Sequence, residues 1–250
     1  MTRWFRDLDL SAVDTLLVDA DGTLFPSEEP AYDASAEVTN RFLAELGAER
    51  SYSPGELQAM TNGKNFRAAA TELAEARGRT LGGADLEDWV QQEKDVVTRH
   101  LEQVLRPDPD VVGPVTALSD RFVLAAVTSS ASSRLDACLQ VSGLADLFDP
   151  GRRFSAEDSL PRPTSKPDPA VYAHAGRELG VGADRAVAVE DSVNGALSAV
   201  AAGFPTIGTV QFVPSEQRAA RVEALGEAGV CVVVDSWTEV LDVLRVVAVP

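Results

Sequence analysis

Residues that commonly carry redox or base chemistry are scarce in this chain of 250 residues, which has two cysteines and two histidines. Cys138 and Cys231 stand in apolar contexts without a partner at a metal-binding spacing, so we expect two buried free thiols. His100 and His174 fall inside helical patterns and match no catalytic motif. These shortages argue against a disulfide framework, a cysteine-based metal site and a histidine base.

Positive charge is scarce as well. The 22 Lys and Arg residues are outnumbered by 39 Asp and Glu residues, which gives a formal net charge of -17 at pH 7. We therefore expect no binding to nucleic acid or to an anionic membrane through general charge attraction. An anionic substrate would have to be held by local groups, namely a metal ion, a few cations or backbone amides.

Long apolar runs are absent. The first ten residues include two arginines and two aspartates and lack the apolar core of a signal peptide. No stretch approaches the ~20 apolar residues that a membrane-spanning helix needs. We expect a cytoplasmic protein that is a monomer or a homodimer, without a membrane partner.

Five short apolar runs are present, and they predict buried strands because they are rich in Val, Ala, Ile and Leu and do not alternate with polar residues. They cover residues 15–19, 122–128, 186–190, 205–209 and 230–234. Helical patterns lie between them at residues 132–141, 168–179, 192–202 and 236–246. This alternation predicts an α/β fold with a doubly wound, parallel, Rossmann-like sheet.

Residues 28–107 interrupt the alternation, because they show helical periods only. We expect helices at residues 36–46, 54–60, 65–77 and 85–105. A segment of this length is too long for a simple crossover between strands. The sequence therefore predicts a core domain made of residues 1–27 and 108–250, with an inserted all-helical cap domain at 28–107.

Chemically active side chains follow several of the predicted strands. In open α/β sheets, ligands bind at the carboxyl ends of the strands, so these groups should converge. Three of the groups also precede a predicted helix. The candidates are Asp19 and Asp21, the turn Thr128-Ser129-Ser130, Lys166 in a polar loop, and Glu190-Asp191.

Some residues of this set suit a metal ion, and the others suit a phosphate group. Carboxylates suit a hard cation, and we expect Mg²⁺, whereas a lysine, hydroxyls and backbone amides suit an oxyanion. Phosphoryl transfer needs a nucleophile in line, cations on the equatorial oxygens and an acid for the leaving oxygen. An aspartate can be that nucleophile and form an aspartyl-phosphate.

Four motifs in order make the sequence resemble the haloacid dehalogenase superfamily, in the helical-cap branch of β-phosphoglucomutase-like proteins and sugar-phosphate phosphatases. They are Asp19-x-Asp21-Gly22-Thr23, then Thr128, then Lys166-Pro167-Asp168-Pro169, then Glu190-Asp191-Ser192-x-x-Gly195. The resemblance extends from about residue 15 to residue 234. The ordered set is highly specific, whereas a lone Asp-x-Asp pair would be weak.

The resemblance implies a role for each matching position. Asp19 would be the nucleophile and a metal ligand, and Asp21 would act as general acid and then base, with its backbone carbonyl on the metal. Asp191 would be the third protein ligand of Mg²⁺, and Glu190 would support the metal site directly or through water. The transferring phosphoryl group would be held by Thr128, Lys166 and the Ser129 amide.

Two further basic residues are candidates for substrate binding. Lys64 lies between two predicted helices of the cap and is the best cap candidate for contact with the substrate. Arg134 begins a helix close to Thr128, where it could touch a phosphate or a sugar, although a plain helix position is at least as good an interpretation. We expect the cap to close over the site and choose the leaving group.

The predicted function is hydrolysis of a small phosphorylated metabolite, a phosphomonoester. The runner-up is a β-phosphoglucomutase-like sugar phosphomutase. Such mutases resemble each other in having a histidine shortly after the first motif, and residues 27–33 contain none. A more remote alternative is a non-catalytic binding protein, whose expected mark is loss of the nucleophile or the lysine. Both Asp19 and Lys166 are present.

Overall fold

The computed structural model describes residues 2–61 and 65–246, and the chain divides into two compact units. One unit combines the chain up to Pro26 with the chain from Arg106 onward. The other consists of Ser27–Leu105. Each unit has its own secondary structure.

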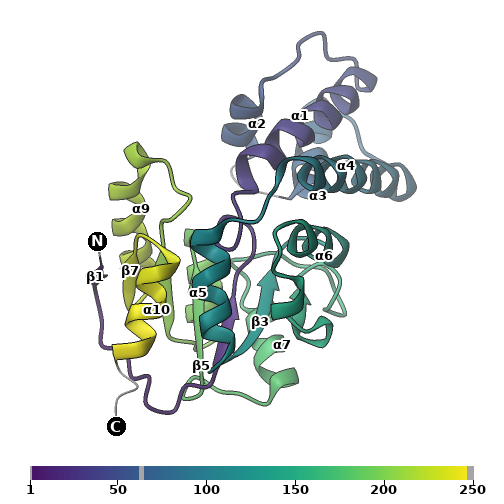
Figure 1. Ribbon diagram of the computed structural model, residues 1–250. Helices are drawn as coiled ribbons and strands as arrows, with labels where there is room; N and C mark the ends of the chain where they lie inside the picture. The colour runs from purple at the N-terminus through teal and green to yellow at the C-terminus, as the bar shows by residue number, and fades with distance from the viewer. Residues whose placement is uncertain (1, 62–64, 247–250) are drawn as a thin grey trace. The chain divides into compact units, whose positions relative to one another are not determined.

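The first unit is built on a seven-stranded sheet with the order β1-β7-β6-β5-β2-β3-β4. β1 pairs with β7 in the antiparallel sense, and the other neighbouring strands pair in parallel. The predicted α/β fold with a doubly wound parallel sheet is therefore confirmed (Figure 1). The strands are β1 (Arg3–Trp4), β2 (Thr15–Val18), β3 (Val123–Thr128), β4 (Arg153–Ser155), β5 (Ala186–Glu190), β6 (Thr206–Thr209) and β7 (Val232–Val234).

β2 lies in the middle of the sheet, where the order of strands reverses. Val18 at its end is in register with Ala126 of β3 on one side and with Val189 of β5 on the other. All four residues of β2 are buried, as the non-alternating apolar run predicts. Consequently the residues that follow β2, β3 and β5 emerge side by side at the point where ligands of such sheets bind.

Helices cover both faces of this sheet. α5 (Pro109–Ser119) and α10 (Trp237–Val246) pack against each other on one face (Figure 1). On the other face, α7 (Ala170–Leu179) and α8 (Val193–Ala201) share an apolar cluster with the strands, and α9 (Ser215–Ala228) extends that layer. α6 (Ser132–Val141) connects β3 to β4. Burial on two faces explains why the central strands contain little besides small and branched apolar residues.

The second unit consists of α1 (Glu28–Glu45), α2 (Pro54–Thr61), α3 (Phe66–Glu75) and α4 (Gly83–Val104). Its core includes Phe42, Leu43 and Leu73, and the Phe42 ring meets the edge of Trp89 at a centroid distance of 5.6 Å. α1 begins eight residues before the predicted start at residue 36. The earlier start is compatible with Pro30, because a proline in the first turn of a helix removes no hydrogen bond, and Glu28 and Glu29 favour that end of the helix dipole.

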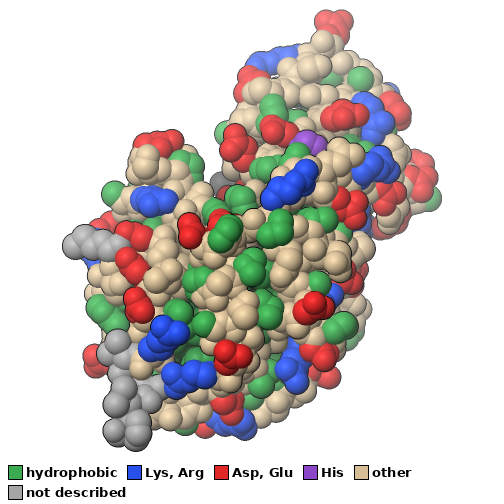
Figure 2. Space-filling view, in the orientation of Figure 1, with side chains coloured by type: hydrophobic (Ala, Val, Ile, Leu, Met, Phe, Trp, Pro, Cys, Tyr) green, Lys and Arg blue, Asp and Glu red, His purple; other side chains and the backbone are tan. Residues whose placement is uncertain are grey.

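Acidic and basic side chains are interspersed over the face seen in Figure 2, so the excess of acidic residues does not gather into one patch there. Within the described part of the chain, every helix is too short or too polar to cross a membrane.

Candidate active site

The turn after β2 aims two carboxylates at the edge of the sheet. The Asp19 backbone N–H donates to the Val189 carbonyl at 3.0 Å, which extends the pairing of β2 with β5 by one residue. The chain then turns at Gly22, whose φ of +81° is readily adopted only by glycine. A Cβ there would lie 2.5 Å from the Asp191 Oδ2 atom, so the glycine also lets the two acidic segments approach each other.

Lys166 is held between two of the predicted acidic residues. Its Nζ atom donates to Asp19 Oδ1 at 2.5 Å, to Glu190 Oε1 at 2.6 Å and to the Val127 carbonyl at 2.8 Å. The three charged side chains are buried. An ammonium group has three N–H donors, so these three acceptors fix the position of the Lys166 nitrogen fully.

Burial and charge shift the protonation equilibria of this cluster. The pKa of Asp19 is raised to about 7, mainly by burial and then by the negative charge of Glu190, while Lys166 opposes the shift. For Lys166, burial lowers the pKa, but attraction to Asp19 and then to Glu190 outweighs burial and the net shift is upward. The lysine therefore stays charged and offsets only part of the negative charge around it.

Asp19, Glu190 and Asp191 form a group that could hold a metal ion. Each offers one carboxylate oxygen, and these oxygens lie within 4.8 Å of one another. Three buried carboxylates beside one ammonium group leave an excess of negative charge that a bound cation would neutralise, and oxygen donors suit a hard cation. Asp191 is held by Thr23, whose Oγ1 donates to Asp191 Oδ1 at 3.0 Å. The donor set therefore fits a hard divalent ion.

Asp21 meets the turn that follows β3. Thr128 Oγ1 donates to Asp21 Oδ2 at 3.3 Å, and Ser130 Oγ donates to the same oxygen at 2.8 Å. The Thr128 hydroxyl also accepts the Ser130 backbone N–H at 2.9 Å. Ser129 Oγ accepts the Lys166 backbone N–H at 3.1 Å, which ties this turn to the loop that carries the lysine.

The structure thus brings together most of the residues singled out from the sequence. Asp19, Lys166, Glu190 and Asp191 lie around one point, and Asp21 joins the Thr128–Ser130 turn beside it. Arg134 lies half-buried in the first turn of α6. Lys64 lies outside the described residues.

Tyr172 contacts these side chains although it was not among the predicted site residues. The Tyr172 hydroxyl, fully buried on α7, donates to Glu190 Oε1 at 2.6 Å. The Tyr172 ring packs in the apolar cluster between its helix and the sheet, whereas its hydroxyl reaches Glu190. The sequence signal that could have identified Tyr172 is its position six residues after Lys166, on the helix face that packs against the sheet.

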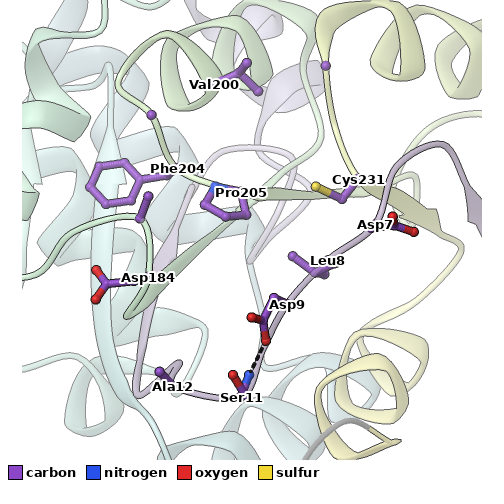
Figure 3. A pocket seen from close by; sticks show the side chains of 13 residues that line it. Asp7, Leu8, Asp9, Ser11, Ala12, Asp184, Val200, Phe204, Pro205 and Cys231 are labelled. Atoms are coloured by element: carbon purple, nitrogen blue, oxygen red, sulfur yellow. Dashed lines mark hydrogen bonds between the residues drawn. The ribbon is translucent and has the colours of Figure 1, made fainter.

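A separate hollow lies at the opposite edge of the sheet (Figure 3). Its volume is about 370 Å³, and it is lined by segments that precede β5, β6 and β7, including Asp184, Phe204, Pro205 and Cys231. These are the amino ends of parallel strands, whereas ligands of such sheets bind at the carboxyl ends. The chemistry of the chain is concentrated at the other edge.

Known proteins resemble the chain over most of its length. The sequence model of haloacid dehalogenase-like hydrolases matches residues 13–203. Protein CbbY of Cereibacter sphaeroides is 27% identical over 219 residues, covering 85% of this chain and 91% of that protein.

Two solved structures share the fold. A structure of CbbY from Rhodobacter sphaeroides in complex with xylulose-(1,5)-bisphosphate has a TM-score of 0.69 at 23% identity, covering 91% of this chain and 96% of that chain. A putative β-phosphoglucomutase from Thermotoga maritima has a TM-score of 0.64 at 26% identity, covering 94% and 100% of the two chains.

Proposed function

Because this chain belongs to the haloacid dehalogenase-like hydrolase family and is a phosphatase enzyme, we propose that it hydrolyses a small phosphomonoester, a sugar phosphate or a similar metabolite, with Mg²⁺ as its cofactor. The observation that carries the proposal is the buried contact of Lys166 with Asp19, beside the carboxylates of Glu190 and Asp191. A sugar bisphosphate bound to a CbbY protein of the same fold supports the substrate class.

Asp19 is the proposed nucleophile. One of its carboxylate oxygens attacks phosphorus, the bond between phosphorus and the ester oxygen breaks, and an aspartyl-phosphate forms. Lys166 holds Asp19 in place through its Nζ atom and carries positive charge to the oxygens of the transferring group, where Thr128 and the Ser129 amide add hydrogen-bond donors.

Asp21 is the proposed general acid and base. It gives its proton to the departing ester oxygen, and it then takes a proton from the water that attacks the aspartyl-phosphate, releasing inorganic phosphate and restoring Asp19. Hydrogen bonds from Thr128 and Ser130 orient its carboxylate. Asp21 regains in the second step the proton that it gives up in the first, and the water oxygen leaves in inorganic phosphate. No histidine is needed for either step.

The proposed ligands of Mg²⁺ are the carboxylates of Asp19 and Asp191 and the backbone carbonyl of Asp21, with Glu190 supporting the site. When bound, the ion supplies positive charge that screens the repulsion between the carboxylates and an anionic substrate. Without a cation, the buried side chains of Asp19, Glu190 and Asp191 would carry an excess of negative charge. We expect activity to disappear with a chelator, to return with Mg²⁺ and to be inhibited by Ca²⁺, whose coordination shell is larger and looser.

Phosphate release from p-nitrophenyl phosphate and from a panel of phosphorylated metabolites, measured with Mg²⁺, tests this function. Asp19→Asn should abolish turnover, and Asp21→Asn should lower it by about 10²- to 10⁴-fold. Asp14→Asn is the matched control, because Asp14 precedes the other end of β2 and pairs with Arg185. Equal activity of the wild type and Asp19→Asn would reject the proposed nucleophile.

A phosphomutase is less favoured. Residues 27–33 contain no histidine, and Glu28–Asp33 fall in the first turns of α1. A hexose phosphate supplied with a bisphosphate activator separates the two reactions, because a phosphatase releases phosphate and a mutase returns an isomerised sugar phosphate. A purely binding protein would gain support if the wild type were inactive on the whole panel.

A further inference from the structure

Arg221 contacts the proposed metal site from outside every sequence motif. It lies on α9, and its Nη1 atom donates to the backbone carbonyl of Asp191 at 2.8 Å. The same nitrogen is 3.8 Å from Asp191 Oδ2. The Asp191 side chain is 4% exposed and that of Arg221 is 26% exposed, so the contact is buried on the Asp191 side and partly open to water on the Arg221 side.

The segment that carries Asp191 is held on several sides. Thr23 donates to one carboxylate oxygen, and the Cβ-free face of Gly22 lies against the other. Directly after it, Ser192 caps α8 by accepting the Gly195 backbone N–H at 2.9 Å. These contacts restrain the side chain and the following helix, whereas Arg221 restrains the main-chain carbonyl of Asp191 itself.

We propose that Arg221 is a positioning residue for the metal site, an inference that rests on the proposed function. By fixing the Asp191 peptide, it sets the direction in which the carboxylate leaves the main chain. It also ties α9 to the loop that carries Asp191. The motif residues alone would hold that loop less firmly. Arg221 contacts neither the substrate nor the reacting atoms in this scheme.

Two effects of Arg221 on a bound cation oppose each other. Its positive charge repels the cation, but the guanidinium is partly exposed, so water and salt screen that repulsion. Its hydrogen bond holds a ligand in place, and loss of such outer contacts typically weakens metal binding by about 10- to 100-fold. We expect the positioning effect to outweigh the repulsion, so removal of Arg221 weakens metal binding.

Isothermal titration of the metal-free full chain with Mg²⁺ tests this inference without measuring activity. Arg221→Met should weaken Mg²⁺ binding by about tenfold. Arg218→Met is the matched control on the same helix, because Arg218 also donates to backbone carbonyls, those of Gln211 and Val213, and not to a proposed ligand. Arg218→Met should bind Mg²⁺ as the wild type does.

Failure of the proposed function and failure of the proposed role of Arg221 give different binding results. A wild type that binds no Mg²⁺ would overturn the proposed function. Normal binding by the wild type, together with equal or tighter binding by Arg221→Met, would overturn the role of Arg221 alone. Equal weakening by both arginine variants would also overturn it, because α9 would then act only through its general stability. If Arg221→Met does not fold, Arg221→Gln is measured against the same thresholds.

Discussion

At the scale of single residues, Glu190 joins two buried donors from different segments of the chain. Lys166 and Tyr172 both donate to its Oε1 atom, each at 2.6 Å, and the Lys166 nitrogen lies 5.0 Å from the centre of the Tyr172 ring. A fully buried carboxylate is tolerated only where donors or cations satisfy it. Glu190 therefore aligns the lysine as well as contributing charge to the metal site.

Replacing Tyr172 with Phe removes a single oxygen atom and leaves the packing in place. We expect kcat to fall by about tenfold with little change in KM, because a buried hydrogen bond to a charged group is worth roughly 1.5–3 kcal/mol and Glu190 would hold Lys166 less firmly. Steady-state kinetics measure the effect. Tyr52→Phe, in the helical unit, is the control, and an unchanged kcat in Tyr172→Phe would show that its hydroxyl is dispensable.

Gly195 leaves room for the Glu190 carboxylate. A Cβ at this position would overlap the Glu190 Oε2 atom, so Gly195→Ala should displace that side chain. We expect at least a tenfold loss of phosphatase activity and a loss of about 1–3 kcal/mol in the free energy of unfolding. Gly113→Ala, at an exposed and open position of α5, should instead keep activity and gain up to about 1 kcal/mol. Full activity of Gly195→Ala would show that catalysis does not require the Glu190 carboxylate at its present position.

The raised pKa of Asp19, about 7, predicts how the metal-free protein responds to pH. The folded state holds the Asp19 proton more tightly than the unfolded chain, so stability from this group is present at low pH and is lost as the pH rises through 7. Asp19→Asn cannot titrate there. Denaturant unfolding with a chelator, from pH 5 to pH 8, should show the wild type losing stability relative to Asp19→Asn. Parallel curves would contradict the shift.

At the scale of elements, the sequence predicts best where burial on two faces imposes a simple pattern. β2, β3 and β5 have runs without alternation, and their ends carry the motifs, so the meeting of Asp19, Thr128 and Glu190 follows from parallel pairing. β1 and β4 were not predicted, because strands of two and three residues are too short to show a period. Tyr172 and Arg221 were missed because their contacts depend on tertiary packing.

β1 closes one edge of the sheet, at the far end of the strand order from β4. Phe5, just after it, packs so closely on Gly226 of α9 that a Cβ at Gly226 would overlap its ring. Gly226→Ala should therefore loosen β1 and lower the free energy of unfolding by about 1–3 kcal/mol. Because β7 and β6 separate β1 from β5, we expect activity at a permissive temperature to be retained. A simultaneous loss of activity in the folded variant would show that the change reaches the catalytic groups, with α9 and its contact from Arg221 to Asp191 as the available route.

At the scale of the whole molecule, the net charge of -17 and the proposed anionic substrate have to be reconciled. The described site does so locally, because Lys166 and Arg221 lie against the carboxylates and a divalent cation would add to them. General attraction of the surface for phosphate is not required. The proposed role of the motifs at the strand ends is limited to the phosphoryl group. These motifs therefore do not determine which substrate is hydrolysed.

The most direct test of the account is a crystal structure of the protein with Mg²⁺ and beryllofluoride, a mimic of a transferred phosphoryl group. We predict beryllium bonded to a carboxylate oxygen of Asp19, with Mg²⁺ beside it on Asp19 and Asp191 and with Lys166 on the fluorides. An empty site with Asp19 turned away, or beryllofluoride and Mg²⁺ bound to other residues, would rule out Asp19 as the nucleophile beside a metal ion.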